Sequence, residues 1–145
     1  MIDRFKLIAS AYLFLVQDGQ ILLARRFQTG YEDGKYGLPS GHLEDGETLM
    51  ECIVREAKEE IGILIDPTDI TFAYCIHRKS DRNGVDFFFT TKKWSGTVTN
   101  REPEKCDHVA WFPLDDLPDT IIGYIKDAIE GWQKEEVYQE AGWNR

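Results

Sequence analysis

One stretch of the chain, residues 41–63, reads Gly41-His-Leu-Glu-Asp-Gly-Glu47-Thr-Leu-Met-Glu-Cys-Ile-Val-Arg55-Glu56-Ala-Lys-Glu59-Glu60-Ile-Gly62-Ile63. Its spacing of apolar residues predicts a helix over residues 48–61. Thr48 and Glu51 match a capping box, in which each side chain accepts a hydrogen bond from the other residue's backbone N–H. Gly62 can end the helix in a left-handed conformation. Both ends of this helix are therefore marked in the sequence.

Three acidic side chains of the predicted helix share one sector of the helical wheel. At about 100° per residue, Glu56, Glu59 and Glu60 border the apolar stripe and do not lie opposite it. Like charges at this spacing repel, and partial burial raises the cost. A hard divalent cation would remove that conflict, although a solvated acidic face with Arg55 as an ordinary ion-pair partner explains these residues equally well. The stripe is expected to contain Met50, Ile53, Val54, Ala57 and Ile61.

The rest of the chain predicts a mixed β-sheet and a second helix. Asp18-Gly19 lies between two apolar runs and is typical of a tight hairpin. A loop rich in glycine and proline is expected over residues 27–41. Strands are expected at residues 5–16, 21–26, 63–65, 70–77, 85–91 and 109–112, and a helix at 121–138. We therefore expect an α/β (α+β) fold and a single domain over residues 1–145.

Composition excludes several classes of protein. The 145 residues include 17 basic and 26 acidic ones, a net charge of −9, which argues against binding a nucleic-acid polymer through bulk charge. No apolar run is long enough for a membrane span, and no signal peptide is recognisable. Cys52, Cys75 and Cys106 are odd in number and far apart, as expected for reduced thiols in a cytoplasmic protein. We expect no nucleic-acid polymer and no membrane among its partners.

Residues 41–63 resemble the Nudix box, the signature of the Nudix hydrolase family, and every fixed position of that motif matches. Flanking segments resemble the MutT-type branch, which hydrolyses nucleotides. One departure is Ser40, where the family often has glycine. The resemblance implies an α/β/α sandwich with a mixed sheet, the box helix and a C-terminal helix. The similar flanks are Leu22-Leu-Ala-Arg-Arg26, Gly37-Leu-Pro-Ser-Gly41, Glu102-Pro-Glu-Lys-Cys-Asp107 and Trp111-Phe-Pro-Leu-Asp-Asp-Leu-Pro118.

The resemblance also implies roles for residues of the box. A divalent metal, Mg²⁺ or alternatively Mn²⁺, would be held by carboxylates and one backbone carbonyl. Arg55, together with Glu47, would orient those carboxylates, and Gly41 and Gly62 would serve backbone geometry at the two ends of the helix. The implied metal ligands are Glu56, Glu59, Glu60 and the carbonyl of Ser40, and the implied catalytic residues are Glu59, Glu60, Arg55 and Glu102.

The general base and the substrate contacts lie partly outside the helix. In this family the base is a box glutamate or one from a later loop, where Glu102 is preferred over Glu104. Arg25 and Arg26 end a strand and should point to opposite faces, so only one is expected to reach a substrate phosphate, and we expect Arg26. His42 is a second candidate for phosphate contact. Each of these residues has an ordinary surface or loop role as its alternative.

The expected reaction is hydrolysis of a nucleoside triphosphate, including oxidised or noncanonical ones, to the monophosphate and diphosphate. The alternatives are a pyrophosphatase of nucleotide sugars or dinucleoside polyphosphates, and a non-catalytic Nudix-fold module that binds nucleotides. The expected partner is a small nucleotide, and a homodimer is the expected assembly to test. The sequence leaves the preferred nucleobase open.

Overall fold

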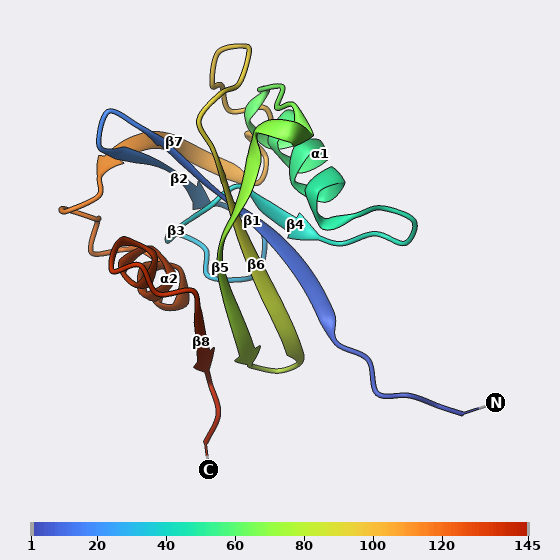
Figure 1. The fold of residues 1–145 in the computed structure, drawn as a ribbon. Coiled ribbons are helices and arrows are strands. Elements are labelled where there is room, and N and C mark those ends of the chain that lie inside the picture. Colours follow the sequence, from blue (N-terminus) through green and yellow to red (C-terminus); the bar gives the residue numbers. More distant parts are fainter. Residues whose placement is uncertain (1, 145) are drawn as a thin grey trace.

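The computed structural model describes residues 2–144. Figure 1 shows strands in the middle, with α1 and α2 on opposite sides of them. A short 3₁₀ turn, Pro67–Asp69, precedes β5. The elements in chain order are β1 (Ile8–Gln17), β2 (Gln20–Arg26), β3 (Tyr36–Gly37), β4 (Ser40–His42), α1 (Leu49–Ile61), β5 (Ile70–Lys79), β6 (Asn83–Thr91), β7 (Cys106–Pro113), α2 (Gly123–Gln133) and β8 (Tyr138–Ala141).

Strand β1 organises the sheet. It runs parallel to β6 along most of its length. At its start it pairs antiparallel with β4, and at its end it forms the predicted hairpin with β2. Both turn residues of the hairpin, Asp18 (φ 53°) and Gly19 (φ 74°), are left-handed, as a two-residue hairpin turn of this hand requires. The sheet continues from β6 to β5 and β8, while β7 pairs with β2.

The alternation of β1 side chains divides the core into two layers. Leu13 and Leu15 belong to the cluster that contains Ile53 of α1. Tyr12 and Phe14 belong to the cluster that contains Ile125 of α2. Because successive side chains of a strand point to opposite faces, one strand supports both helices. The predicted α/β/α sandwich with a mixed sheet is therefore confirmed.

Three predicted elements were wrong or incomplete. The loop expected over residues 27–41 contains β3 and the first residues of β4. Residues 63–65 form only one isolated bridge, between Leu64 and Ser95. The helix expected over 121–138 ends at Gln133, and Glu135 is left-handed (φ 63°), so the chain turns and adds β8 parallel to β5. Pairing with distant strands decides these segments, and local sequence does not report it.

The three cysteines are free. Within residues 2–144, neither helix is long and apolar enough to cross a membrane.

Candidate active site along helix α1

Helix α1 has the ends that its sequence predicts. The Thr48 hydroxyl accepts a hydrogen bond from Glu51 N (3.1 Å), and the Glu51 carboxylate accepts one from Thr48 N (2.8 Å). Gly62 (φ 73°) donates its N–H to the carbonyl of Lys58 at 3.2 Å. The helix buries Cys52, Ile53, Ala57 and Ile61, whereas Met50, expected in the stripe, is 36% exposed. The caps define where α1 begins and ends, and its buried residues pack it against the sheet. Its acidic sector therefore has a defined position.

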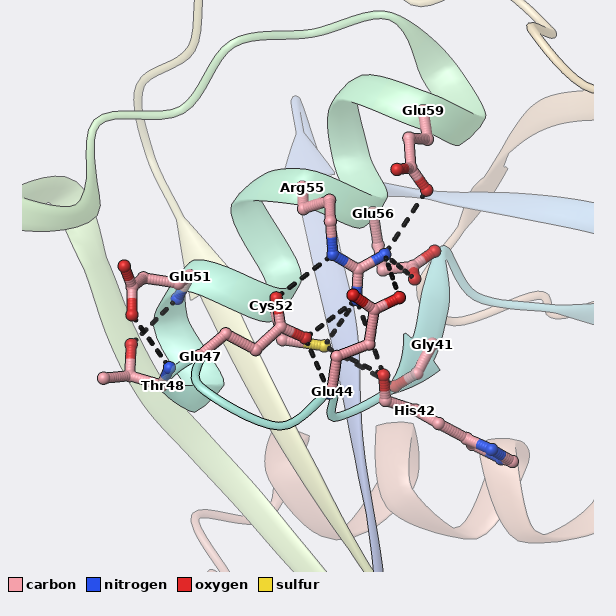
Figure 2. Close-up of polar contacts among 10 residues, drawn as sticks. All are labelled: Gly41, His42, Glu44, Glu47, Thr48, Glu51, Cys52, Arg55, Glu56 and Glu59. Carbon is pink, nitrogen blue, oxygen red and sulfur yellow. Dashed lines mark hydrogen bonds and ion pairs between the residues drawn. The ribbon is translucent and has the colours of Figure 1, made fainter.

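Arg55 lies at the centre of the acidic residues, as Figure 2 shows. Its guanidinium contacts Glu47 through both nitrogens of one edge, at 2.8 and 3.1 Å. The same group contacts Glu56 at 2.7 Å, Glu59 at 3.4 Å and Glu44 at 3.8 Å. These contacts lower the pKa of Glu47 to about 2, the hydrogen bonds from Arg55 being the main cause. Arg55 thus contacts several carboxylates, and Glu47, which was expected to act together with it, is one of them.

Gly41 lies in β4, directly against α1. A Cβ atom at this position would overlap the carboxyl group of Glu56. Its φ is not among the positive ones, unlike that of Gly62. The expectation that Gly41 shapes the end of the helix was therefore wrong in its reason: the glycine leaves room for the Glu56 side chain to pass. The role expected of Gly62, a left-handed helix end, matches the structure.

Glu60 and Glu56 carry negative charge into a half-buried position. The Glu60 carboxylate accepts a hydrogen bond from the backbone N–H of Ser40 at 2.9 Å. Burial, with the nearby charges of Glu56 and Glu102, raises the pKa of Glu60 well above its usual range. Burial also raises the pKa of Glu56, against the effect of Arg55. Glu59 is more exposed, at 53% of its side chain. The site therefore has more carboxyl groups than its neighbours can pair with, and ionising Glu56 and Glu60 together is unfavourable.

These carboxylates line a cavity of about 380 Å³ between α1, β2 and the segment before β7. Glu102 lies on its wall, whereas Glu104 does not. Backbone of residues 37–40 closes one side. Acidic and basic groups thus face each other across a space that is open to a ligand. The charged lining residues are Glu44, Glu56, Glu59, Glu60 and Glu102, with Arg25, Arg26, Arg55 and Lys105 as the cations.

The two arginines at the end of β2 are held differently. Arg25 forms an ion pair with Asp107 at 2.7 Å, so its charge is already matched. Arg26 donates to the carbonyl of Tyr31 at 2.6 Å and lies over the Tyr31 ring, 5.3 Å from its centre. No carboxylate pairs with Arg26 among the described ion pairs of residues 2–144. Arg26 is thus not held by an ion pair as Arg25 is, and its contact with a phosphate stays a prediction.

His42 does not face the carboxylates. Figure 2 shows its side chain pointing away from Arg55. Its Nε2 atom lies 3.0 Å from a guanidinium nitrogen of Arg82, and burial together with Arg82 lowers the pKa of His42. The ring lines a second cavity, of about 450 Å³, which shares Arg26 and Ser40 with the first. The two cavities therefore adjoin, and His42 belongs to the second.

Sequence reasoning did not assign a role to most residues of this second cavity. Tyr12 and Tyr124 contact each other through their hydroxyls at 3.0 Å, although they are 112 positions apart. Arg78 lies 3.8 Å above the Tyr124 ring and pairs with the buried Asp86 at 2.7 Å. Aromatic residues in strands and helices usually signal only a core. Nothing in the local sequence marks these residues as lining a cavity.

The donor set fits a divalent cation by its chemistry. Carboxylate oxygens are ligands that Mg²⁺ prefers, and the uncompensated charge around Glu60 favours a cation there. Within residues 2–144, no three His, Cys, Asp or Glu side chains converge on one ion position as they stand. Instead, Glu56 contacts Arg55 and Glu60 contacts Ser40. The carboxylates expected as ligands thus line the first cavity. Each of them contacts another group of the protein, either Arg55 or Ser40 N.

Comparison with known proteins identifies the family. Residues 6–131 match the NUDIX domain. An 8-oxo-dGTP diphosphatase of Proteus vulgaris is 31% identical over 103 residues, which cover 70% of this chain and 90% of that protein. An NAD-capped RNA hydrolase NudC of Stutzerimonas stutzeri is 25% identical over 122 residues, 81% of this chain, but the match spans only 41% of that longer protein.

A solved structure agrees with this match. The crystal structure of a MutT NUDIX hydrolase from Burkholderia pseudomallei superposes with a TM-score of 0.80 at 27% identity, covering 87% of this chain and 98% of that one. The acidic helix, its caps and the cavity beside it lie within the matched residues 6–131. The chain therefore belongs to the NUDIX domain family and is a Nudix hydrolase with MutT-type relatives.

Proposed function

We propose that this Nudix hydrolase cleaves nucleoside triphosphates, including oxidised or noncanonical ones, to the monophosphate and diphosphate in a reaction that needs Mg²⁺ or Mn²⁺. The observation that carries the proposal is the first cavity, where the surplus of carboxylates around Glu60 faces the cations Arg26 and Lys105. Such a site can take a polyphosphate only if a cation offsets the carboxylates. The Proteus vulgaris relative, named an 8-oxo-dGTP diphosphatase, supports the choice of substrate.

The metal would be held by Glu56, Glu59 and Glu60, with the Ser40 carbonyl as a further ligand. When bound, a divalent ion lowers the pKa of water and offsets charge on phosphate oxygens. Ser40 N donates to Glu60 at 2.9 Å and so keeps one carboxylate oxygen aimed along the cavity wall. Arg55 holds Glu56 and Glu59 from the opposite side. The protein thereby fixes the positions of its anions before any ligand arrives.

Glu102 is the residue proposed to accept the proton of the attacking water. It lies on the cavity wall and is close enough to raise the pKa of both Glu56 and Glu60. A base beside the last turn of α1 can face the water while the box carboxylates hold the metal. Its contact with Lys105 is long, at 4.0 Å, and the Lys105 side chain is 64% exposed, so this ion pair holds the carboxylate only weakly.

Arg26 is proposed to contact the phosphates, since it lines both cavities and its charge lies near the carboxylate of Glu60 without forming a described ion pair. The nucleoside would then extend into the second cavity, where His42 and Arg82 lie. His42 is therefore proposed as a substrate contact of the second cavity. A nucleotide spanning the two spaces places its phosphates beside α1 and its base among aromatic and polar groups.

A product analysis tests this proposal. Purified protein with Mg²⁺ is given dGTP, 8-oxo-dGTP, the other nucleoside triphosphates, a nucleotide sugar, a dinucleoside polyphosphate and an NAD-capped RNA. We expect a monophosphate and free diphosphate from at least one triphosphate, and no turnover with EDTA. Cleavage of only the nucleotide sugar, the dinucleoside polyphosphate or the capped RNA would replace the proposed substrate class. Turnover unchanged by EDTA would overturn the metal requirement.

We further propose that residues 1–145 act as one domain in a cytoplasmic protein, as the free cysteines and the single sheet favour. A homodimer is the assembly to test, by light scattering of the purified chain.

A further inference from the structure

Glu102 lies on a short turn, outside any helix or strand. The turn runs from the end of an extended segment to the start of β7 at Cys106. Its backbone closes on itself, because Lys105 N and Cys106 N both donate to the carbonyl of Glu102 at 2.9 Å. These bonds fold the turn, and a further one, from Phe27 N to the carbonyl of Lys105 at 3.0 Å, attaches its far end to the residue after β2. A catalytic group on such a turn needs further support to hold its position.

The amide of Asn100 supplies contacts at both ends of the turn. Its oxygen accepts a hydrogen bond from Glu102 N at 3.0 Å, and its nitrogen donates to the carbonyl of Cys106 at 2.6 Å. An amide is needed for this pair of contacts, since one end must accept and the other must donate. The reversed orientation would set the amide N–H group against the N–H of Glu102. Asn100 therefore ties the backbone of the proposed base, Glu102, to the first residue of the strand after it, Cys106.

The backbone beside Asn100 is attached to the last turn of α1. Thr99 N donates to the carbonyl of Ile61 at 3.0 Å, and Arg101 N donates to the carbonyl of Glu60 at 3.0 Å. These two bonds flank Asn100 in sequence. They satisfy carbonyls that the end of a helix leaves without an intrahelical partner. The segment that carries Glu102 is thus placed against the residue, Glu60, that it faces in the cavity.

We propose that Asn100 is a positioning residue for catalysis, which acts by holding Glu102 toward the attacking water. The inference rests on the proposed function, in which Glu102 accepts the proton. Asn100 does not line the cavity and touches no substrate position. Its amide instead joins two parts of one chain of contacts that runs from the last turn of α1, through Asn100, to Glu102 and β7.

The test compares Asn100→Ala, Glu102→Gln and the double variant, with Asn83→Ala as a matched control. Asn83 also uses its amide, in a 2.8 Å contact with His77, and is not among the residues that line either cavity. Diphosphate release is measured with the most rapidly cleaved triphosphate of the substrate panel, and folding is checked by thermal unfolding. We expect Asn100→Ala to lower kcat about 10- to 100-fold with little change in KM. Asn83→Ala should leave kcat unchanged.

The double variant separates positioning from a general loss of structure. If Asn100 acts through Glu102, adding Asn100→Ala to Glu102→Gln should change kcat by less than about twofold. Independent, multiplying losses would overturn the inference, and so would full kcat in Asn100→Ala alongside an impaired Glu102→Gln. Full activity of Glu102→Gln would overturn both the inference and the proposed base. Thermal unfolding of Asn100→Ala far below that of Asn83→Ala, with kcat restored on cooling, would show a structural role only and overturn the inference.

Discussion

Two half-buried arginines, one on each side of the sheet, differ in the number of carboxylates around them. On the α2 side, Arg78 pairs with one carboxylate, Asp86, at 2.7 Å, and Tyr12 donates a further hydrogen bond to Asp86 at 3.1 Å. On the α1 side, Arg55 lies within 4.0 Å of four carboxylates: Glu44, Glu47, Glu56 and Glu59. Burial alone would lower the pKa of Arg78, but the hydrogen bond and charge of Asp86, with the Tyr124 and Tyr12 hydroxyls, together raise it above its usual value, so that pair stays ionised.

This difference distinguishes a structural ion pair from a cluster that can bind a ligand. The Arg78 pair is balanced, and its hydrogen bonds are satisfied inside the protein. The Arg55 cluster has more carboxylates than one guanidinium can pair with, and Glu60 lies beside it with a pKa that burial raises well above its usual range. Folding alone gains nothing from such a surplus, because each extra buried carboxylate costs free energy. The surplus is explained if a bound cation completes the cluster.

The largest expected effect comes from removing one charge of the surplus. Glu59→Gln or Glu60→Gln should lower the rate of diphosphate release about 10³-fold or more, as expected when a metal ligand is lost. Because burial raises the pKa of Glu60, ionising it costs stability at neutral pH. Glu60→Gln should therefore also unfold at a higher temperature than the wild type.

Glu51→Gln is the matched control on the same helix. Glu51 accepts a hydrogen bond from Thr48 N in the capping box, and glutamine can replace glutamate there. This variant should keep full activity. Full activity in both Glu59→Gln and Glu60→Gln would contradict the assigned role of the surplus.

Breaking the balanced pair should affect stability. Asp86→Ala leaves the Arg78 charge half-buried and without its partner, which should lower the free energy of unfolding by about 3–5 kcal/mol. Urea unfolding at neutral pH measures this change. A decrease of less than about 1 kcal/mol in the free energy of unfolding would contradict this, since that is the contribution of an exposed ion pair.

Gly41→Ala tests whether the position of one carboxylate matters, because it displaces Glu56 without removing it. The added Cβ overlaps the carboxyl group of Glu56, which must leave its contact with Arg55. We expect diphosphate release to fall about 10- to 100-fold. Gly123→Ala is the control, since a Cβ at Gly123 meets no atom within 4 Å. Equal activity of the two variants would show that the position of Glu56 does not matter.

The smallest expected effect concerns Glu47 and pH. Arg55 lowers the pKa of Glu47 to about 2 in the folded protein, so the ion pair stabilises the fold above the unfolded pKa of about 4.3. That contribution is lost as pH falls from about 4.3 to about 2. Glu47→Gln should thus be less stable than wild type at pH 7 and equally stable near pH 2. A difference in unfolding temperature that is constant over this range would contradict the pairing.

The sequence predicted features whose partners are close in the chain. The caps at Thr48 and Gly62 and the Asp18-Gly19 hairpin depend on neighbours within a few residues, and all three are present. The family motif also singled out Arg55 and Glu47 as residues that act together, and the two side chains are in contact at 2.8 Å.

Features that depend on distant pairing escaped prediction. Strand β8 forms because β5 has an unpaired edge, not because residues 138–141 have a distinctive pattern. The Ser40 N–H bond to Glu60 and the Asn100 contacts around Glu102 join segments that only the fold brings together. The acidic sector of α1 could be seen in the sequence, but its attachment to Arg55 and Ser40 could not.

Calorimetric titration with Mg²⁺ tests whether the carboxylates beside Arg55 bind a divalent cation. If the carboxylates around Arg55 and Glu60 are a metal site, wild-type protein should take up Mg²⁺ with a saturable, defined stoichiometry. Uptake should be strongly weakened in Glu59→Gln and Glu60→Gln and unchanged in Glu51→Gln. No saturable uptake by the wild type, or equal uptake by all four proteins, would contradict the claim.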